Sequence, residues 1–107
     1  MGCPGDLRER ILDELKFILN KELAKENVRV YLFGSWARQE EKQSSDIDIA
    51  IESHSPLSPF TWNQLIEQIE DSTIPYKVDV VDMHHAEGAL VQQVKEEGIL
   101  WKDYRND

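Results

Sequence analysis

The stretch LFGSWARQEEKQSSDIDIAIE, residues 32–52, decides how this chain folds. An apolar run ends at Gly34-Ser35, a polar segment follows, and the run from Asp46 to Glu52 alternates strictly. Its isoleucines fall on one face of a strand, and Asp46 and Asp48 fall together on the other. Two carboxylates held this close raise each other's pKa unless a cation shares their charge. The stretch therefore predicts two strands, a tight turn between them, and a pair of carboxylates that needs a cation.

Hydrophobic periodicity predicts the other elements. Asp6 can cap a helix over residues 6–25, in which Leu and Ile recur at helical spacing. Ser35 is expected to cap a short helix that begins at Trp36. The chain as a whole, residues 1–107, is predicted to be a single α/β (α+β) domain with residues 1–5 as a frayed start. Strands are predicted over residues 28–33, 46–52 and 76–82, helices over 60–71 and 86–97, and either a fourth strand or a docked tail over 99–101.

Composition narrows the class of protein. The chain has 12 Lys and Arg against 21 Asp and Glu, and its net charge of −9 should repel nucleic acid and anionic membrane surfaces. Cys3 is the only cysteine, so the fold cannot depend on an internal disulfide, which fits a reducing compartment. No apolar run approaches the roughly 18 to 20 residues of a membrane span. We therefore expect a cytoplasmic protein that contacts neither membranes nor nucleic acid directly.

The two halves of the opening stretch suit complementary parts of a nucleotide. A glycine at the end of a strand lets the backbone turn sharply, and the free amides of a following helix bind phosphate. Arg38, about one turn later, can add a charged donor. The carboxylates of Asp46 and Asp48 are hard oxygen ligands of the kind that Mg²⁺ takes together with substrate phosphates. The pattern indicates a phosphate turn beside half of a magnesium site.

This pattern resembles a known family. Gly34-Ser35-x-Ala37-Arg38, followed by Ser45-Asp46-Ile47-Asp48-Ile49, is similar to the signature of the polymerase-β-like nucleotidyltransferases, in particular the minimal nucleotidyltransferases of bacteria and archaea. The resemblance implies that family's fold, a small mixed sheet of three or four strands flanked by helices. It also implies that Gly34, Ser35, Arg38 and Ser45 bind the nucleotide phosphates and that two Mg²⁺ ions are bound by Asp46, Asp48 and a third carboxylate.

The third carboxylate should come from the strand YKVDVVD. Asp79 and Asp82 both lie on it, and their odd separation places them on opposite faces, so only one can join the pair. We choose Asp79, because it lies between Val78 and Val80, where a charge most needs a partner. Asp79 would bind the metal nearer the attacking hydroxyl in a two-metal displacement.

The resemblance also implies a function. It implies Mg²⁺-dependent transfer of a nucleoside monophosphate, AMP from ATP, to a hydroxyl group with release of pyrophosphate. The chain is short for an acceptor-binding lobe, so a partner is expected: a HEPN-domain toxin, for which the chain would be the antitoxin, a second copy of the chain, or both. The charge of −9 suits a basic partner. Two alternatives stay open, a module that neutralises its partner by contact alone and a small-molecule transferase like the aminoglycoside nucleotidyltransferases.

Three further residue types have open roles. Trp36 could stack on a base, dock a partner or simply pack. Lys77 could contact phosphate or the carboxylates, or form a surface salt bridge. His54, His84 and His85 have no regular ligand spacing and no accompanying cysteines, so we interpret them as solvated loop residues rather than zinc ligands.

Overall fold

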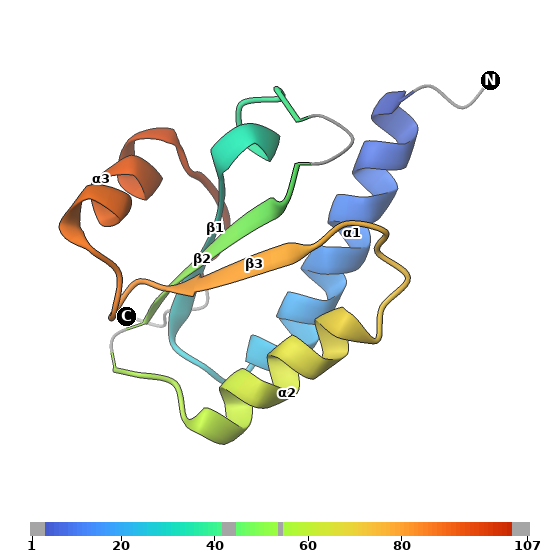
Figure 1. Cartoon of the computed structure of the whole chain (residues 1–107). Coiled ribbons are helices and arrows are strands. Elements are labelled where there is room, and N and C mark those ends of the chain that lie inside the picture. The colour runs from blue at the N-terminus through green and yellow to red at the C-terminus, as the bar shows by residue number, and fades with distance from the viewer. Residues whose placement is uncertain (1–3, 42–44, 54, 104–107) are drawn as a thin grey trace.

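The computed structural model describes residues 4–41, 45–53 and 55–103 (Figure 1). Its strands form one sheet in the order β3-β2-β1-β4, in which β1 runs antiparallel to both β2 and β4, and β2 runs parallel to β3. The predicted small mixed sheet is therefore confirmed, and residues 99–101 belong to a fourth strand rather than a docked tail. The elements are α1 Pro4–Leu23, β1 Val28–Phe33, a short 3₁₀ helix η1 Gly34–Trp36, β2 Ile47–Ser53, α2 Pro59–Glu70, β3 Val78–Asp82, α3 Gly88–Glu97 and β4 Ile99–Asp103.

Two predicted helix starts are wrong. Helix α1 begins at Pro4, which suits a first turn because proline has no amide hydrogen to satisfy, so Asp6 lies inside the helix instead of capping it. The 3₁₀ helix begins at Gly34 rather than Trp36, and Ser35 therefore lies within it instead of capping it. Cys3 and the rest of residues 1–3, part of the predicted frayed start, lie outside the described residues.

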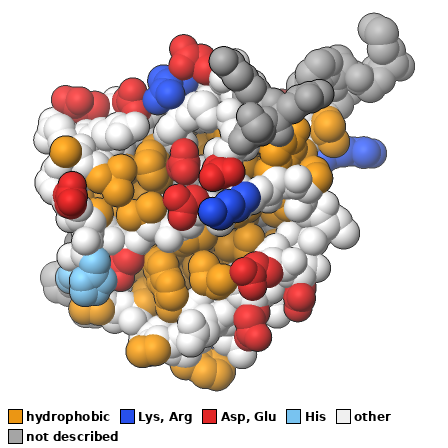
Figure 2. Space-filling view, in the orientation of Figure 1, with side chains coloured by type: hydrophobic (Ala, Val, Ile, Leu, Met, Phe, Trp, Pro, Cys, Tyr) orange, Lys and Arg blue, Asp and Glu red, His pale blue; other side chains and the backbone are white. Residues whose placement is uncertain are grey.

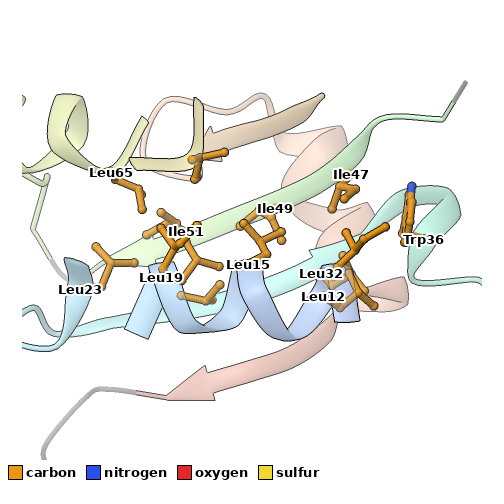
Figure 3. Close-up of a cluster of buried hydrophobic side chains, with 14 of the residues drawn as sticks. Leu12, Leu15, Leu19, Leu23, Leu32, Trp36, Ile47, Ile49, Ile51 and Leu65 are labelled. Atoms are coloured by element: carbon orange, nitrogen blue, oxygen red, sulfur yellow. The ribbon is translucent and has the colours of Figure 1, made fainter. Parts of the chain in front are cut away.

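One face of the sheet packs against α1 and α2, which lie side by side (Figure 1). Figure 3 shows Leu15 and Leu19 of α1 pointing toward Ile49 and Ile51 of β2, with Leu65 of α2 closing the cluster. All five side chains are at most 1% exposed. Apolar residues at helical spacing on α1 thus meet the isoleucine face of β2. Among the described residues, no helix is long and apolar enough to cross a membrane.

The opposite face carries α3 and a smaller cluster. Ala50 of β2 packs there with Phe33, Met83 and Val94, all of them buried. Side chains two apart on a strand share a face, so Asp48 lies on the same side as Ala50. Helix α3 covers the region around Ala50, and Asp48 is left half-buried. One face of the sheet is therefore covered by apolar packing, and part of the opposite face carries charged side chains.

The core predicts a clear contrast in stability. Leu15→Ala should lower the free energy of unfolding by about 2 to 5 kcal/mol, because it removes a fully buried side chain and leaves a cavity. Phe17→Ala on the same helix should cost far less, because Phe17 is 68% exposed. Urea unfolding of the two variants measures the difference. Equal losses would contradict this description of the core.

Candidate active site

Two predicted site residues lie directly opposite each other. Asp48 of β2 pairs in register with Asp79 of β3, and on its other side with Phe33, the last residue of β1. Val78 and Val80 pack toward α1 and α2, so Asp79 faces the other way, toward the side that carries Asp48. Figure 2 shows acidic side chains gathered beside a basic one near the centre of this face, where β2 and β3 cross the view.

Of the two other acidic candidates, Asp46 lies near Asp48 and Asp82 does not. Asp46 lies one residue before β2, is exposed, and is close enough to Asp48 to raise its pKa. Asp82 lies elsewhere, since its Oδ1 accepts a hydrogen bond of 2.9 Å from the backbone amide of His84. The structure thus brings Asp46, Asp48 and Asp79 together and leaves Asp82 to a turn.

The surroundings of Asp48 disfavour the ionised form of its carboxyl group. Burial raises the pKa of Asp48 to about 6 from its ordinary value of 3.8, and the neighbouring charges of Asp79 and Asp46 add to the rise. The charge of Arg38 acts in the opposite direction. Within the described ranges, none of the three carboxylates has a hydrogen bond or ion pair. A bound cation would supply the opposite charge that they lack.

The carboxylates suit an open magnesium site better than a closed one. In the part of the chain that the structure describes, no three His, Cys, Asp or Glu side chains are grouped closely enough to hold one metal ion. Mg²⁺ usually takes only one or two protein carboxylates and fills its remaining positions with water and substrate phosphates. Asp48, with its raised pKa and its neighbours Asp46 and Asp79, fits that donor set. A magnesium ion held by these residues would take its other ligands from water or from a bound substrate.

Gly34 places the turn against Asp48. Its φ of 77° lies in the left-handed region, and a Cβ atom built on it would lie 2.3 Å from Oδ2 of Asp48. The amides of Ala37 and Arg38 both donate to the Gly34 carbonyl, at 3.1 and 3.2 Å. The first amides of a helical turn have no carbonyl within the turn to which they can donate. The amides of Ser35 and Trp36 are therefore the ones suited to bind a phosphate.

Arg38 and Ser45 lie at the rim of this site. Arg38 is close enough for its charge to act on Asp48, but its side chain forms ion pairs with Glu40 at 2.8 Å and Glu97 at 3.3 Å. The carbonyl of Ser45 accepts a hydrogen bond of 3.3 Å from the indole of Trp36. The pairing of Arg38 with Glu97 of α3 could not be predicted from the sequence, because 59 residues separate the two.

Trp36 has the packing role among its three alternatives. Its side chain is only 2% exposed, and its ring meets that of Tyr76 edge-on with the centroids 5.2 Å apart. The guanidinium of Arg8 lies 5.7 Å from the ring centroid and also donates a hydrogen bond to the Trp36 carbonyl. The indole is thus enclosed by residues from distant parts of the chain and does not face a ligand.

His84 and His85 do not enter the site, and Lys77 lies directly before β3. His84 and His85 are exposed, and His85 Nε2 lies 3.8 Å from a carboxylate oxygen of Asp82. His54 lies outside the described residues. Lys77 is exposed, and its backbone carbonyl accepts a hydrogen bond of 2.9 Å from Ile47, next to the first pair of the β2–β3 register.

The sheet, the glycine turn and the paired carboxylates define a nucleotidyltransferase. Residues 6–105 match the family described as polymerase beta, nucleotidyltransferase, and the chain belongs to that family. It is 33% identical over 97 residues to a Methanocaldococcus jannaschii protein that carries a provisional name as a protein adenylyltransferase, covering 86% of this chain and 98% of that one. It is 34% identical over 79 residues to the protein adenylyltransferase MntA of Shewanella oneidensis, covering 73% of this chain and 56% of MntA.

Solved structures show the same fold. A chain in a crystal structure of a toxin-antitoxin with AMP-PNP aligns with a TM-score of 0.67 and 28% identity, over 82% of this chain and 73% of that one. A chain in the structure of a tri-AMPylated Shewanella oneidensis HEPN toxin in complex with its MNT antitoxin aligns with a TM-score of 0.66 and 26% identity, over 90% of this chain and 72% of that one.

The close approach of Gly34 to Asp48 predicts an intolerant position. Gly34→Ala should lower the free energy of unfolding by about 1 to 3 kcal/mol, because the new methyl group would meet the carboxylate and the left-handed φ would be strained. Gly88→Ala is the control, since no atom lies within 4 Å of the Cβ position at that glycine. Urea unfolding compares the two variants. A Gly34→Ala variant as stable as Gly88→Ala would show that the turn does not press on Asp48.

The pKa of Asp48 predicts a pH-dependent penalty in metal-free protein. Because the folded-state pKa is raised from 3.8 to about 6, the folded chain binds more protons within that window, and its stability falls as pH rises through it. Asp48→Asn should remove the penalty. After allowance for solvent screening it should gain about 1 kcal/mol at pH 8 and nothing at pH 4.

Thermal melting in EDTA across this pH range measures the effect. Asp13→Asn, which removes an exposed acid from α1, controls for the change in net charge. An Asp48→Asn variant that melts below its parent at pH 8 would mean that the carboxylate has a structural role.

Proposed function

We propose that this chain is a Mg²⁺-dependent protein adenylyltransferase that transfers AMP from ATP to a hydroxyl group on a HEPN-domain toxin, and so acts as its antitoxin. The observation that carries the proposal is the in-register pairing of Asp48 with Asp79 beside the Gly34 turn. Family membership supports nucleotidyl transfer. The names of MntA and of the toxin-antitoxin structures support the choice of AMP and of the partner.

The proposed reaction is an in-line displacement at the α-phosphorus of ATP. The hydroxyl oxygen forms a bond to phosphorus as the bond to the bridging oxygen breaks, and pyrophosphate leaves. Asp79 is exposed and lies on the side of β3 that faces Asp48. In the proposed reaction it receives the proton of the incoming hydroxyl group. The first amides of the Gly34 turn would bind phosphate oxygens, with Arg38 and Ser45 at the rim.

The role of magnesium in the proposal is electrostatic. When bound, Mg²⁺ would supply positive charge that offsets the negative charge of the triphosphate during the transfer. Asp46 and Asp48 would hold one ion, and Asp48 and Asp79 a second one nearer the hydroxyl. The raised pKa of Asp48 supports this assignment, because ligation by a cation stabilises the ionised carboxylate that its surroundings disfavour.

Label transfer tests the proposal directly. The chain is incubated with ATP labelled at the α-phosphate, Mg²⁺ and a HEPN-domain protein from the same organism. Label should move to that protein, and Asp79→Asn should reduce the rate by at least about a hundredfold, since general base catalysis alone contributes about 10² to 10⁴. Asp82→Asn is the matched control, because Asp82 lies on the same strand but in a turn contact with His84.

The same variants separate the proposal from simple binding. A transferase should lose neutralisation of the toxin when Asp79→Asn abolishes label transfer. Full neutralisation by Asp79→Asn, with no transfer by the parent chain, would instead favour a module that acts by contact alone. A small-molecule acceptor and a homo-oligomeric form remain predictions from the sequence.

A further inference from the structure

The side chain of Arg38 is held between two carboxylates at the rim of the site. Its Nε donates to Oε1 of Glu40 at 2.8 Å. Its Nη1 donates to Oε2 and Oε1 of Glu97, at 3.3 and 3.5 Å. Glu40 belongs to the loop that follows η1, whereas Glu97 is the last residue of α3. Ion pairs therefore join the loop that carries Arg38 to a helix 59 residues away.

The backbone of Glu40 and the carboxylate of Glu97 have further hydrogen bonds of their own. Gln39 has a φ of 58°, a left-handed conformation uncommon for residues other than glycine, and the amide of Glu40 closes the turn on the Ser35 carbonyl at 2.8 Å. On α3, Nε2 of Gln93 donates to Oε2 of Glu97 at 3.1 Å. The guanidinium of Arg38 thus lies between a carboxylate on a hydrogen-bonded turn and a carboxylate that a glutamine also holds.

This arrangement leaves part of the guanidinium for a ligand. Arginine has five N–H donors in a planar fork. Glu40 engages Nε and Glu97 engages Nη1, while Nη2 forms no hydrogen bond or ion pair with any residue that the structure describes. Arg38 is also close enough to Asp48 for its charge to act on that carboxyl group. A fork held in one orientation loses less conformational freedom when it binds a phosphate.

We propose that Glu97 is a positioning residue that orients Arg38 for a nucleotide phosphate. The inference rests on the proposed function and extends it to a residue of α3 that does not itself touch the nucleotide. Two effects of Glu97 oppose each other. Its pairing orients the guanidinium, whereas its negative charge repels the phosphates, and the sign of the effect of removing it decides which dominates.

Helix α3 contains a matched control. Gln92 donates to Glu96 at 3.0 Å, just as Gln93 donates to Glu97 at 3.1 Å. The two glutamates have the same charge and the same i, i+4 glutamine partner, but only Glu97 touches Arg38. Comparison of Glu97→Ala with Glu96→Ala therefore isolates the contact with arginine.

Binding of a non-hydrolysable ATP analogue with Mg²⁺, measured by calorimetry on the full chain, tests the inference. Glu97→Ala should bind about three- to tenfold more weakly than Glu96→Ala, as expected for coupling between neighbouring groups. In an Arg38→Ala background the two variants should bind equally. Melting temperatures of all variants check that affinity changes without loss of the fold.

Two results would overturn the inference while leaving the proposed function intact. One is a Glu97→Ala variant that binds the analogue as tightly as Glu96→Ala, or more tightly. The other is a difference that persists in the Arg38→Ala background. A parent chain that binds no nucleotide would overturn the inference and the proposed function together.

Discussion

The backbone of Gly34 and the carboxylate of Asp48 occupy adjoining space, and the rest of the site depends on this contact. The antiparallel pairing of β1 with β2 sets Phe33 opposite Asp48, so the turn that leaves β1 must pass directly beside that carboxylate. A side chain at position 34 would meet Oδ2 at 2.3 Å. Only a residue without Cβ brings turn amides and a carboxylate together at this distance, which is the arrangement that a metal-bound phosphate needs.

The sheet divides its two faces between stability and chemistry. On the side of α1 and α2, Ile47, Ile49 and Ile51 of β2 are 0% exposed, and their burial favours folding. On the other side the same strand brings Asp48 beside Asp79, and the mutual repulsion of these charges opposes folding. In this strictly alternating strand, the isoleucines on one face stabilise the fold, and the aspartate on the other face lowers its stability.

The parts of the site that follow from strand alternation could be predicted from the sequence. The period of a strand showed that only one of Asp79 and Asp82 could lie beside Asp48, and the valines on either side of Asp79 decided the choice. The bounds of β1 followed from its apolar run. The parts that depend on distant contacts could not. The burial of Trp36 needs Tyr76, and the orientation of Arg38 needs Glu97, and no local pattern reports either partner.

Strand β3 lies at the edge of the sheet, and Asp79 on it is exposed. Within the described residues no further strand pairs beyond β3, so the site opens past the side of the sheet instead of lying at the bottom of an enclosed pocket. A site that is open in this way does not restrict the size of the molecule that approaches it. Under the proposed function, the acceptor has to bring only a protruding hydroxyl group to the carboxylates, and an entire folded protein can present one as readily as a small molecule can.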